Sequence, residues 1–509
     1  MTKRFWFLLA VMFICIYLFS GCAGETSSEG LNYSLNSDGT SYSVDGLGSC
    51  VDTDLTIPAT YNGLPVTSIS KQAFSKARLI SVKIPESVTF IGESAFSNCA
   101  DLKSIDIPDS VCIIDRWAFS SCANLTDVFI PSKMTEIRYG TFEGCVKLSS
   151  ITIPSNITSL SSNAFKGCSS LDSVRIPSSV ENFGVSVFAD CAQLENVLFD
   201  DNSKLEELDY GAFSNCQQLK SIVFGKNCKL RSIGSHAFEK CTNLLNVEIP
   251  STVVHIENNA FELCVSLKTV IFEENSKIDY IESHAFENCK SLVMVSFGAH
   301  SELTKIYPYA FAECESLTSI RIPSTATHIG EQAFVRCVQL KEVAFDVDSK
   351  LEYIGGYAFS ECGSLQTLEV PDSMTTISEH AFEECNGLVN VFIPNSVASI
   401  ERSAFANCTK LTNVIFEENS QLMVVGESAF FACSALVKID IPARVTEIGR
   451  YAFSGCDNLT RAIFEDKTGW SAFPKKFSGS ELYSEEDAAK YLSKICNSYQ
   501  WNKVWQKQW

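Results

Sequence analysis

The stretch "YAFSECGSL", residues 357–365, decides how this 509-residue chain folds, because its pattern recurs along most of the sequence. The spacing Ala-Phe-x-x-Cys-x-x-Leu, with small variations, returns seventeen times, and neighbouring copies are 23 or 25 residues apart after a first interval of 22. A fixed period of this size is typical of a solenoid, in which each unit buries its apolar face only against its neighbours. The marker residues are Phe74, Phe96, Phe119, Phe142, Phe165, Phe188, Phe213, Phe238, Phe261, Phe286, Phe311, Phe334, Phe359, Phe382, Phe405, Phe430 and Phe453.

Each unit contains the same parts, as "LKSIDIPDSVCIIDRWAFSSC" at 102–122 shows. Ile105 and Ile107 alternate with polar residues, which predicts a short strand with one inward side. Pro108 ends the strand, because proline cannot donate a hydrogen bond to a sheet. An extended, turn-like segment follows, and the spacing of Phe119 and Cys122 then predicts the inward face of a short helical turn.

The units come in two lengths for a reason that the sequence shows. Ten strands end in Ile-Pro or Val-Pro, and we call their units proline units. Seven end in Phe followed by a polar loop, as in "VIFEENSKI" at 270–278, and we call these phenylalanine units. Six of the seven account for all six 25-residue intervals, so the two extra residues are expected in one loop, on one rim of the solenoid.

The pattern C-x-x-L-x-x-[IV]-x-[IF]-P-x-x-[VI]-x-x-I-x-x-x-A-F resembles the BspA-like, treponemal-type subclass of leucine-rich repeats, found on bacterial and some protist cell surfaces. The resemblance covers residues from about 80 to 475. It implies a leucine-rich-repeat solenoid, shaped as a horseshoe or gently curved. One parallel β-sheet would form one face, with short helical turns and extended segments on the other. It also implies adhesion or interaction with a host or partner surface.

The two ends differ from the repeats, as expected for caps that cover an open solenoid core. We predict seventeen repeats at 70–465, a β-rich N-terminal cap at 31–69 and a C-terminal cap at 466–509, both caps resembling those of the same family. The C-terminal cap would contain a short amphipathic helix near 484–495. Its tryptophans, which we expect to seal the last coil although tryptophan can also stack on glycans, are Trp470, Trp501, Trp505 and Trp509.

The first residues, "MTKRFWFLLAVMFICIYLFSGC", predict an export signal, because two basic residues precede a 15-residue apolar run that is too short to span a bilayer comfortably. The ending "LFSGC" resembles the lipobox of bacterial lipoproteins, although Phe19 replaces the usual leucine. This implies removal of residues 1–21 and lipidation of Cys22, followed by a flexible tether at 22–30. The alternative is an ordinary signal peptide with an incidental cysteine. The predicted location is the bacterial cell envelope, lipid-anchored and surface-exposed.

The charge of the chain argues against a nucleic-acid partner. There are 60 acidic and 40 basic residues, and a field of that sign repels phosphate backbones.

Sixteen units place a cysteine in the same column, which raises the question of metal, disulfide or reactive chemistry. Zinc sites need ligand pairs two to four residues apart, whereas here a whole repeat separates the cysteines. Stacked coils lie close enough for disulfides, but equivalent side chains point the same way, so we predict a buried packing role. The column is Cys99, Cys122, Cys145, Cys168, Cys191, Cys216, Cys241, Cys264, Cys289, Cys314, Cys337, Cys362, Cys385, Cys408, Cys433 and Cys456. Whether Cys50, Cys112, Cys228 or Cys496 form disulfides stays open.

No catalytic, cofactor or metal motif stands out, so we predict a protein that is not an enzyme. The chain has no phosphate-binding glycine loop and no HExxH, and a glycosidase has no support because the carboxylates are scattered. Three histidines, His236, His284 and His380, precede the repeated Phe by two residues, where other copies have Ser, Gln, Asn or Tyr. Such free replacement is typical of solvated positions.

The outward side of the predicted sheet is the candidate binding surface. The residue between the two inward aliphatics of each strand mixes apolar and charged types, as protein interfaces do, although such residues also simply form strands well. The residue two positions earlier is mostly small and polar, as at Ser104 and Ser150. The candidate ligand-binding residues are Phe129, Arg175, Leu198, Val223, Glu248, Ile271, Arg321, Glu369, Phe392 and Ile415.

Together these features predict a lipid-anchored surface protein that binds proteins or glycans, in adhesion or another partner interaction. The alternative is an envelope-scaffolding or carbohydrate-binding lipoprotein without an adhesin role.

Overall fold

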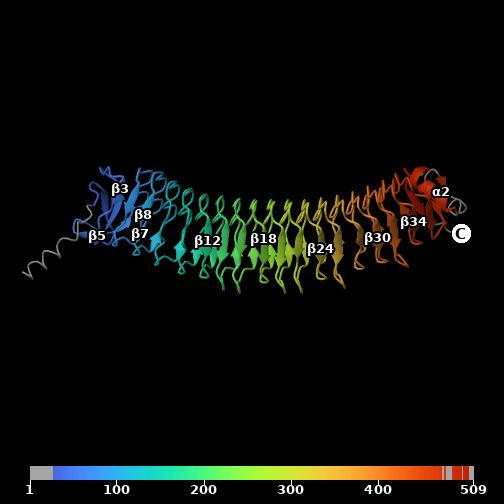
Figure 1. Cartoon of the computed structure of the whole chain (residues 1–509), viewed down its shortest axis with the longest axis horizontal. Helices are drawn as coiled ribbons and strands as arrows, with labels where there is room; N and C mark the ends of the chain where they lie inside the picture. The colour runs from blue at the N-terminus through green and yellow to red at the C-terminus, as the bar shows by residue number, and fades with distance from the viewer. Residues whose placement is uncertain (1–26, 473–474, 477–483, 496, 504–509) are drawn as a thin grey trace, which may run out of the picture.

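A computed structural model describes residues 27–472, 475–476, 484–495 and 497–503, which form an elongated, gently curved solenoid (Figure 1). The predicted signal, Cys22 and the start of the tether lie outside the described residues, as do Cys496, Trp505 and Trp509. Ser28 is buried, and its N–H donates to the carbonyl oxygen of Thr56 at 2.9 Å. The folded part therefore includes Ser28, before the predicted end of the tether at Gly30. Within the described residues, no helix is both long and apolar enough to cross a membrane.

The predicted strands of all but two units form the first of two parallel sheets that run along the solenoid. Two units, at 127–130 and 150–153, have no strand there, yet Ile130 and Ile153 still point into the core. The first-sheet strands are β3 (Asp54–Thr56), β6 (Ser81–Lys83), β8 (Ser104–Asp106), β12 (Ser173–Ile176), β14 (Asn196–Phe199), β16 (Ser221–Val223), β18 (Asn246–Ile249), β20 (Thr269–Phe272), β22 (Met294–Ser296), β24 (Ser319–Ile322), β26 (Glu342–Phe345), β28 (Thr367–Glu369), β30 (Asn390–Ile393), β32 (Asn413–Phe416), β34 (Lys438–Ile441) and β36 (Arg461–Phe464).

A second sheet, which the sequence did not predict, is built from the segments that we expected to be turn-like. Its strands are mostly two residues long, and their buried residue is the last inward aliphatic before the turn, such as Ile377. The strands are β5 (Leu64–Ile69), β7 (Phe90–Ile91), β9 (Ile113–Ile114), β10 (Glu136–Ile137), β11 (Ser159–Leu160), β13 (Asn182–Phe183), β15 (Glu207–Leu208), β17 (Ser232–Ile233), β19 (His255–Ile256), β21 (Tyr280–Ile281), β23 (Lys305–Ile306), β25 (His328–Ile329), β27 (Tyr353–Ile354), β29 (Thr376–Ile377), β31 (Ser399–Ile400), β33 (Val424–Val425) and β35 (Glu447–Ile448).

The Ala-Phe-x-x-Cys segment is not the short helical turn that its spacing predicts. Residues with positive φ recur four positions apart, as at Trp117 (φ 55°) and Ser121 (φ 59°). Successive N–H groups therefore point alternately into the turn and toward the next coil: Ala118 donates to Asp115 at 3.2 Å, and Phe119 donates to Thr141 at 2.9 Å. A helix would direct all of these bonds into its own chain segment. The alternation instead extends hydrogen bonding between coils across the turns.

The core is a continuous stack of the seventeen repeated phenylalanines. From Phe74 to Phe453, neighbouring ring centroids lie 5.0 to 5.6 Å apart and the rings tilt by at most 19°. These rings are buried beside the inward aliphatics of both sheets. Each coil therefore buries its apolar surface mainly against the next, as the repeat period predicts.

The N-terminal cap consists of β1 (Asn32–Leu35), β2 (Tyr42–Gly46) and β4 (Thr60–Tyr61), which add to the edge formed by β5. β4 and β5 form a hairpin around Asn62 and Gly63, whose φ angles of 48° and 81° suit the tight turn that joins such strands.

The C-terminal cap closes the other end with α2 (Glu485–Lys490), η2 (Tyr491–Ile495), β37 (Trp470–Ala472), β38 (Lys475–Lys476) and β39 (Trp501–Lys503). β39 pairs antiparallel with β35, so it covers the last edge of the second sheet. Trp470 and Trp501 are buried, and their rings contact Phe464 at centroid distances of 5.3 and 6.1 Å. The prediction that these two tryptophans seal the last coil is confirmed.

Candidate functional site

The ten candidate residues all point away from the core; nine lie on strands of the first sheet, and Phe129 lies in a unit that has no strand there. Phe392 shows the register: Val391 and Ile393 beside it are buried, whereas 39% of Phe392 is exposed. The other nine are exposed too, so the predicted strand register is confirmed. That these residues bind a ligand stays a prediction.

The sheet brings some of these residues together and keeps others apart. Leu198 lies in register between Arg175 and Val223 on adjacent strands. Phe392 likewise lies between Glu369 and Ile415. The outward side therefore carries two separate apolar patches, Leu198–Val223 and Phe392–Ile415, each flanked by a charged residue.

The two arginines among the ten candidate residues each form an ion pair with an aspartate on the same surface. Arg175 pairs with Asp200 at 2.6 Å, and Arg321 pairs with Asp346 at 2.8 Å, each across to the next coil. Exposed pairs of this kind contribute little to stability. They do cancel the cationic character that the sequence assigned to these positions.

Strand pairing in the first sheet is interrupted at certain junctions between neighbouring units. Where a phenylalanine unit follows a proline unit, their first-sheet strands pair over four residues, as in β24–β26 and β30–β32. In the opposite order, one pair remains in β16–β18 and β22–β24, and β26 and β32 do not pair with β28 and β34 at all. In the first order, the residue after Phe donates to the preceding strand, as Asp346 does to Ile322 at 3.1 Å. In the second order a proline such as Pro371 occupies that place and has no N–H to donate.

Two hollows lie on the outward side at these junctions. One, of about 590 Å³, is lined by Ile271, Phe297 and Arg321. The other, of about 890 Å³, lies between β26 and β28 and is lined by Phe345 and Glu369. The order of the two unit types is visible in the sequence and could have located both hollows.

The C-terminal cap limits the length of the exposed face. α2 packs beside β36, and Glu485 at its start pairs with Arg461 at 2.7 Å. Asp440 and Ile463 on the last two strands are only half-exposed. The series of exposed outward residues on the first sheet therefore ends near Ile415.

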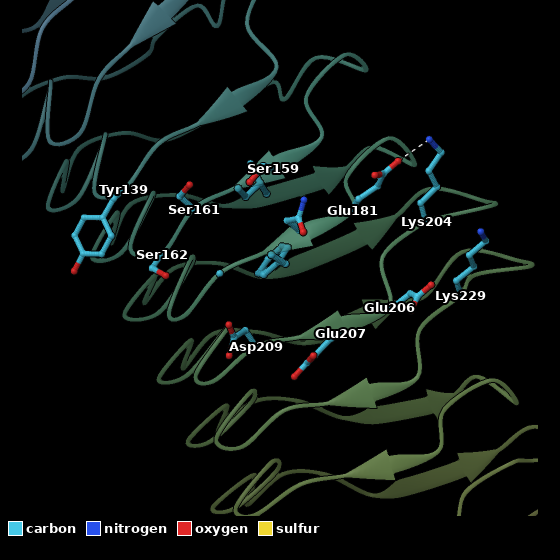
Figure 2. A pocket seen from close by; sticks show the side chains of 14 residues that line it. Tyr139, Ser159, Ser161, Ser162, Glu181, Lys204, Glu206, Glu207, Asp209 and Lys229 are labelled. Carbon is cyan, nitrogen blue, oxygen red and sulfur yellow. Dashed lines mark hydrogen bonds and ion pairs between the residues drawn. The ribbon is translucent and has the colours of Figure 1, made fainter.

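A separate cleft of about 980 Å³ opens on the second sheet, between β13 and β15 (Figure 2). Phe183 occupies an inward position where every other unit has Ile, Leu or Val. Its buried ring lies 5.7 Å from that of Phe213 on the next coil, and β13 does not pair with β15.

The cleft has a polar lining. Figure 2 shows the hydroxyl groups of Tyr139, Ser159, Ser161 and Ser162 along one part and the carboxylates of Glu206, Glu207 and Asp209 along another. Desolvation, followed by the charges of Glu257 and Asp209, raises the pKa of Glu207. At the rim, Lys204 pairs with Glu181 at 2.8 Å. Sequence reasoning missed this site, whose only signal is the aromatic residue at position 183.

The described cysteines are all free, and every column cysteine is buried. Desolvation is the largest cause that raises the pKa of these thiols, to about 11 for Cys99 and to about 12 for Cys385. A thiol that stays protonated is a poor nucleophile and metal ligand. Burial and protonation agree with the predicted packing role.

The three histidines before the repeated Phe are more constrained than the sequence indicated. They are half-buried and not simply solvated, because each Nδ1 contacts the carboxylate three residues later: His236–Glu239 at 2.9 Å, His284–Glu287 at 2.6 Å and His380–Glu383 at 2.8 Å. Each ring also contacts a tyrosine of a neighbouring coil.

The chain is similar to a known repeat family and to several solved structures. A family profile described as "BspA type Leucine rich repeat region (6 copies)" matches residues 67–195, 187–304, 254–389 and 343–460. A leucine-rich repeat protein from Bacteroides ovatus is 24% identical, with a TM-score of 0.49, over 86% of this chain and 94% of its own. A leucine rich cell surface protein from Faecalibacterium prausnitzii is 27% identical, with a TM-score of 0.37, over 78% of this chain and 96% of its own. The comparison with curated proteins gave no match.

Proposed function

Because the chain belongs to the BspA-type leucine-rich-repeat family, we propose that it is a cell-surface protein that captures a protein or glycan partner on the outward side of its first sheet. Adhesion to a host or partner surface is the role that we propose for this binding. The chain would be held at the envelope by lipid on Cys22, which lies outside the described residues.

The Phe392–Ile415 patch is the observation that carries this proposal. The two side chains lie in register on adjacent strands, and 39% and 45% of their surfaces are exposed. A monomer gains nothing from leaving an aromatic and an aliphatic side chain together in water, whereas interfaces use such anchors within a polar rim. Glu369 beside Phe392 supplies a charged neighbour.

The test is to replace Phe129 and Phe392 together by serine. We expect the variant to capture less partner from host-cell extracts or glycan arrays, while its thermal unfolding changes little because both side chains face water. Tyr353→Ser is a matched control, because Tyr353 is equally exposed but lies on the second sheet. Equal loss of capture in the control, or unchanged capture by the double variant, would contradict the proposal.

A carbohydrate-binding role is the second candidate, and the cleft between β13 and β15 favours it. Clustered serine hydroxyls, a tyrosine ring and carboxylates can recognise the hydroxyl groups and ring faces of a sugar. Ser159→Ala combined with Glu207→Gln should then reduce binding of envelope polysaccharides, while Phe392→Ser leaves it unchanged. The opposite pattern would favour the first sheet.

A further inference from the structure

A group of metal-ligating side chains lies outside both binding surfaces, on the turns that carry the His–Glu pairs. His236, Glu239 and Glu262 each offer one ligand atom, and these atoms all lie within 4.8 Å of one another. His236 and Glu239 belong to one coil, and Glu262 comes from the next.

The chain contains an internal comparison that separates this group from an ordinary ion pair. The same His–Glu pair occurs three times. The position that corresponds to Glu262 is Ala312 beside the second pair and Ala406 beside the third. Only the first pair therefore has a carboxylate at this position of the next coil.

Neighbouring side chains hold the three groups in place. The Tyr210 ring lies 4.9 Å from that of His236. Asn259 donates from Nδ2 to Oε2 of Glu262 at 2.7 Å, and Lys240 donates from Nζ to Oε1 of Glu239 at 2.5 Å. These contacts leave Oε2 of Glu239 facing Nδ1 of His236. Contacts from neighbouring side chains that orient the ligands in this way are typical of metal sites in proteins.

Burial and charge favour a cation at this position. Only 27% of the His236 side chain and 16% of the Glu239 side chain are exposed. Two carboxylates face one ammonium group and an imidazole, so the cluster has an excess negative charge when His236 is neutral. Imidazole nitrogen with carboxylate oxygen is a ligand set that suits Zn²⁺ and similar ions.

We propose that His236, Glu239 and Glu262 bind one divalent transition-metal ion, with Zn²⁺ as the best fit, and that the ion links two consecutive coils. Zn–N and Zn–O bonds of about 2.0–2.2 Å separate tetrahedral ligand atoms by about 3.3 Å. The His236 and Glu239 atoms, 2.9 Å apart, must therefore separate slightly to admit the ion. A fourth position would remain open to water.

The test is a calorimetric titration of the full chain with Zn²⁺ alone, in a Cys112→Ser background because Cys112 is exposed. We expect one site, with affinity lowered at least about tenfold by His236→Asn or Glu262→Ala. Both replacements occur naturally at these repeat positions, in Asn163 and Ala189 for example, so the backbone tolerates them. His380→Asn is the matched control and should leave the affinity unchanged.

Two further measurements decide the outcome. Co²⁺ bound at this site should show no thiolate charge-transfer band, and that band would overturn the proposal in favour of a cysteine site. Ala406→Glu, beside the His380–Glu383 pair, should create a second site. The proposal also fails if the chain binds no Zn²⁺, or if His236→Asn and His380→Asn have equal effects.

Discussion

The Sγ atom of Cys362 lies 3.3 Å from the carbonyl oxygen of Phe334, one coil earlier, and donates a hydrogen bond to it. The N–H of Cys337 donates to the same oxygen at 3.2 Å. All sixteen column thiols make the equivalent contact, at 3.0 to 3.4 Å. The cysteine column therefore fills a narrow space and also supplies the second donor to each buried carbonyl group.

Replacing Cys362 separates these two roles. Cys362→Ala removes the sulfur and leaves a small cavity, and we expect it to lower the free energy of unfolding by about 1–2 kcal/mol. Cys362→Val restores volume but not the donor, and its second methyl group must fit a packed site, so it should be at least as destabilising. Chemical denaturation followed by circular dichroism measures both. A valine variant as stable as the original would show that only volume matters.

The free energy of unfolding of the solenoid should fall at alkaline pH. Burial raises the pKa of the column thiols above their ordinary value of 9.0, to about 11 for Cys99 and to about 12 for Cys337. The folded chain then holds protons that the unfolded chain releases, so stability is complete below pH 9 and falls as the pH rises toward 11–12. Each thiol costs about 1.4 kcal/mol per pH unit in that window.

Thermal unfolding between pH 7 and 11 checks this expectation. The midpoint should be nearly flat up to pH 8.5 and then fall steeply, with several protons released per molecule on unfolding. A midpoint that does not change up to pH 10.5 would contradict it.

The repeat pattern predicts the core and the outward row well, because both depend on alternation within one unit. Phe359 and Cys362 are inward and Phe392 is outward, as their spacing indicates. The predicted helical conformation of the Ala-Phe-x-x-Cys segment was wrong, because apolar residues three apart fit both a helix and a chain of tight turns. The second sheet was missed because a two-residue strand such as Thr376–Ile377 has no measurable period.

Features that depend on two neighbouring units could not be read from one. The unpaired junction between β26 and β28 depends on a phenylalanine unit preceding a proline unit. The His236–Glu239–Glu262 group depends on a glutamate in the next coil. His236 looks freely replaceable when its column is compared by itself, because that comparison leaves out Glu262 on the next coil.

Leu263 offers a site for stabilisation. It has φ of 59°, in the left-handed region, where equivalent units often have Asn or Gly. A leucine there costs about 1–2 kcal/mol of strain, which asparagine partly avoids. We therefore expect Leu263→Asn to raise the free energy of unfolding by about 0.5–1 kcal/mol, and Asn288→Leu, at the same position of the next unit, to lower it by a similar amount. Changes of the same sign in both variants would contradict the strain argument.

Cys22 is the one cysteine that we expect to be modified. It follows the "LFSG" segment that resembles a lipobox, and an acylated cysteine with two or more chains would hold the folded domain at a membrane. Cys22→Ala should abolish metabolic labelling with palmitate and release the protein from the membrane fraction. Cys112→Ala is the control, because Cys112 is exposed yet lies within the folded repeats, and it should keep both label and membrane retention. Retention without label in Cys22→Ala would mean that the chain is held at the envelope by contacts of its folded domain and not by lipid.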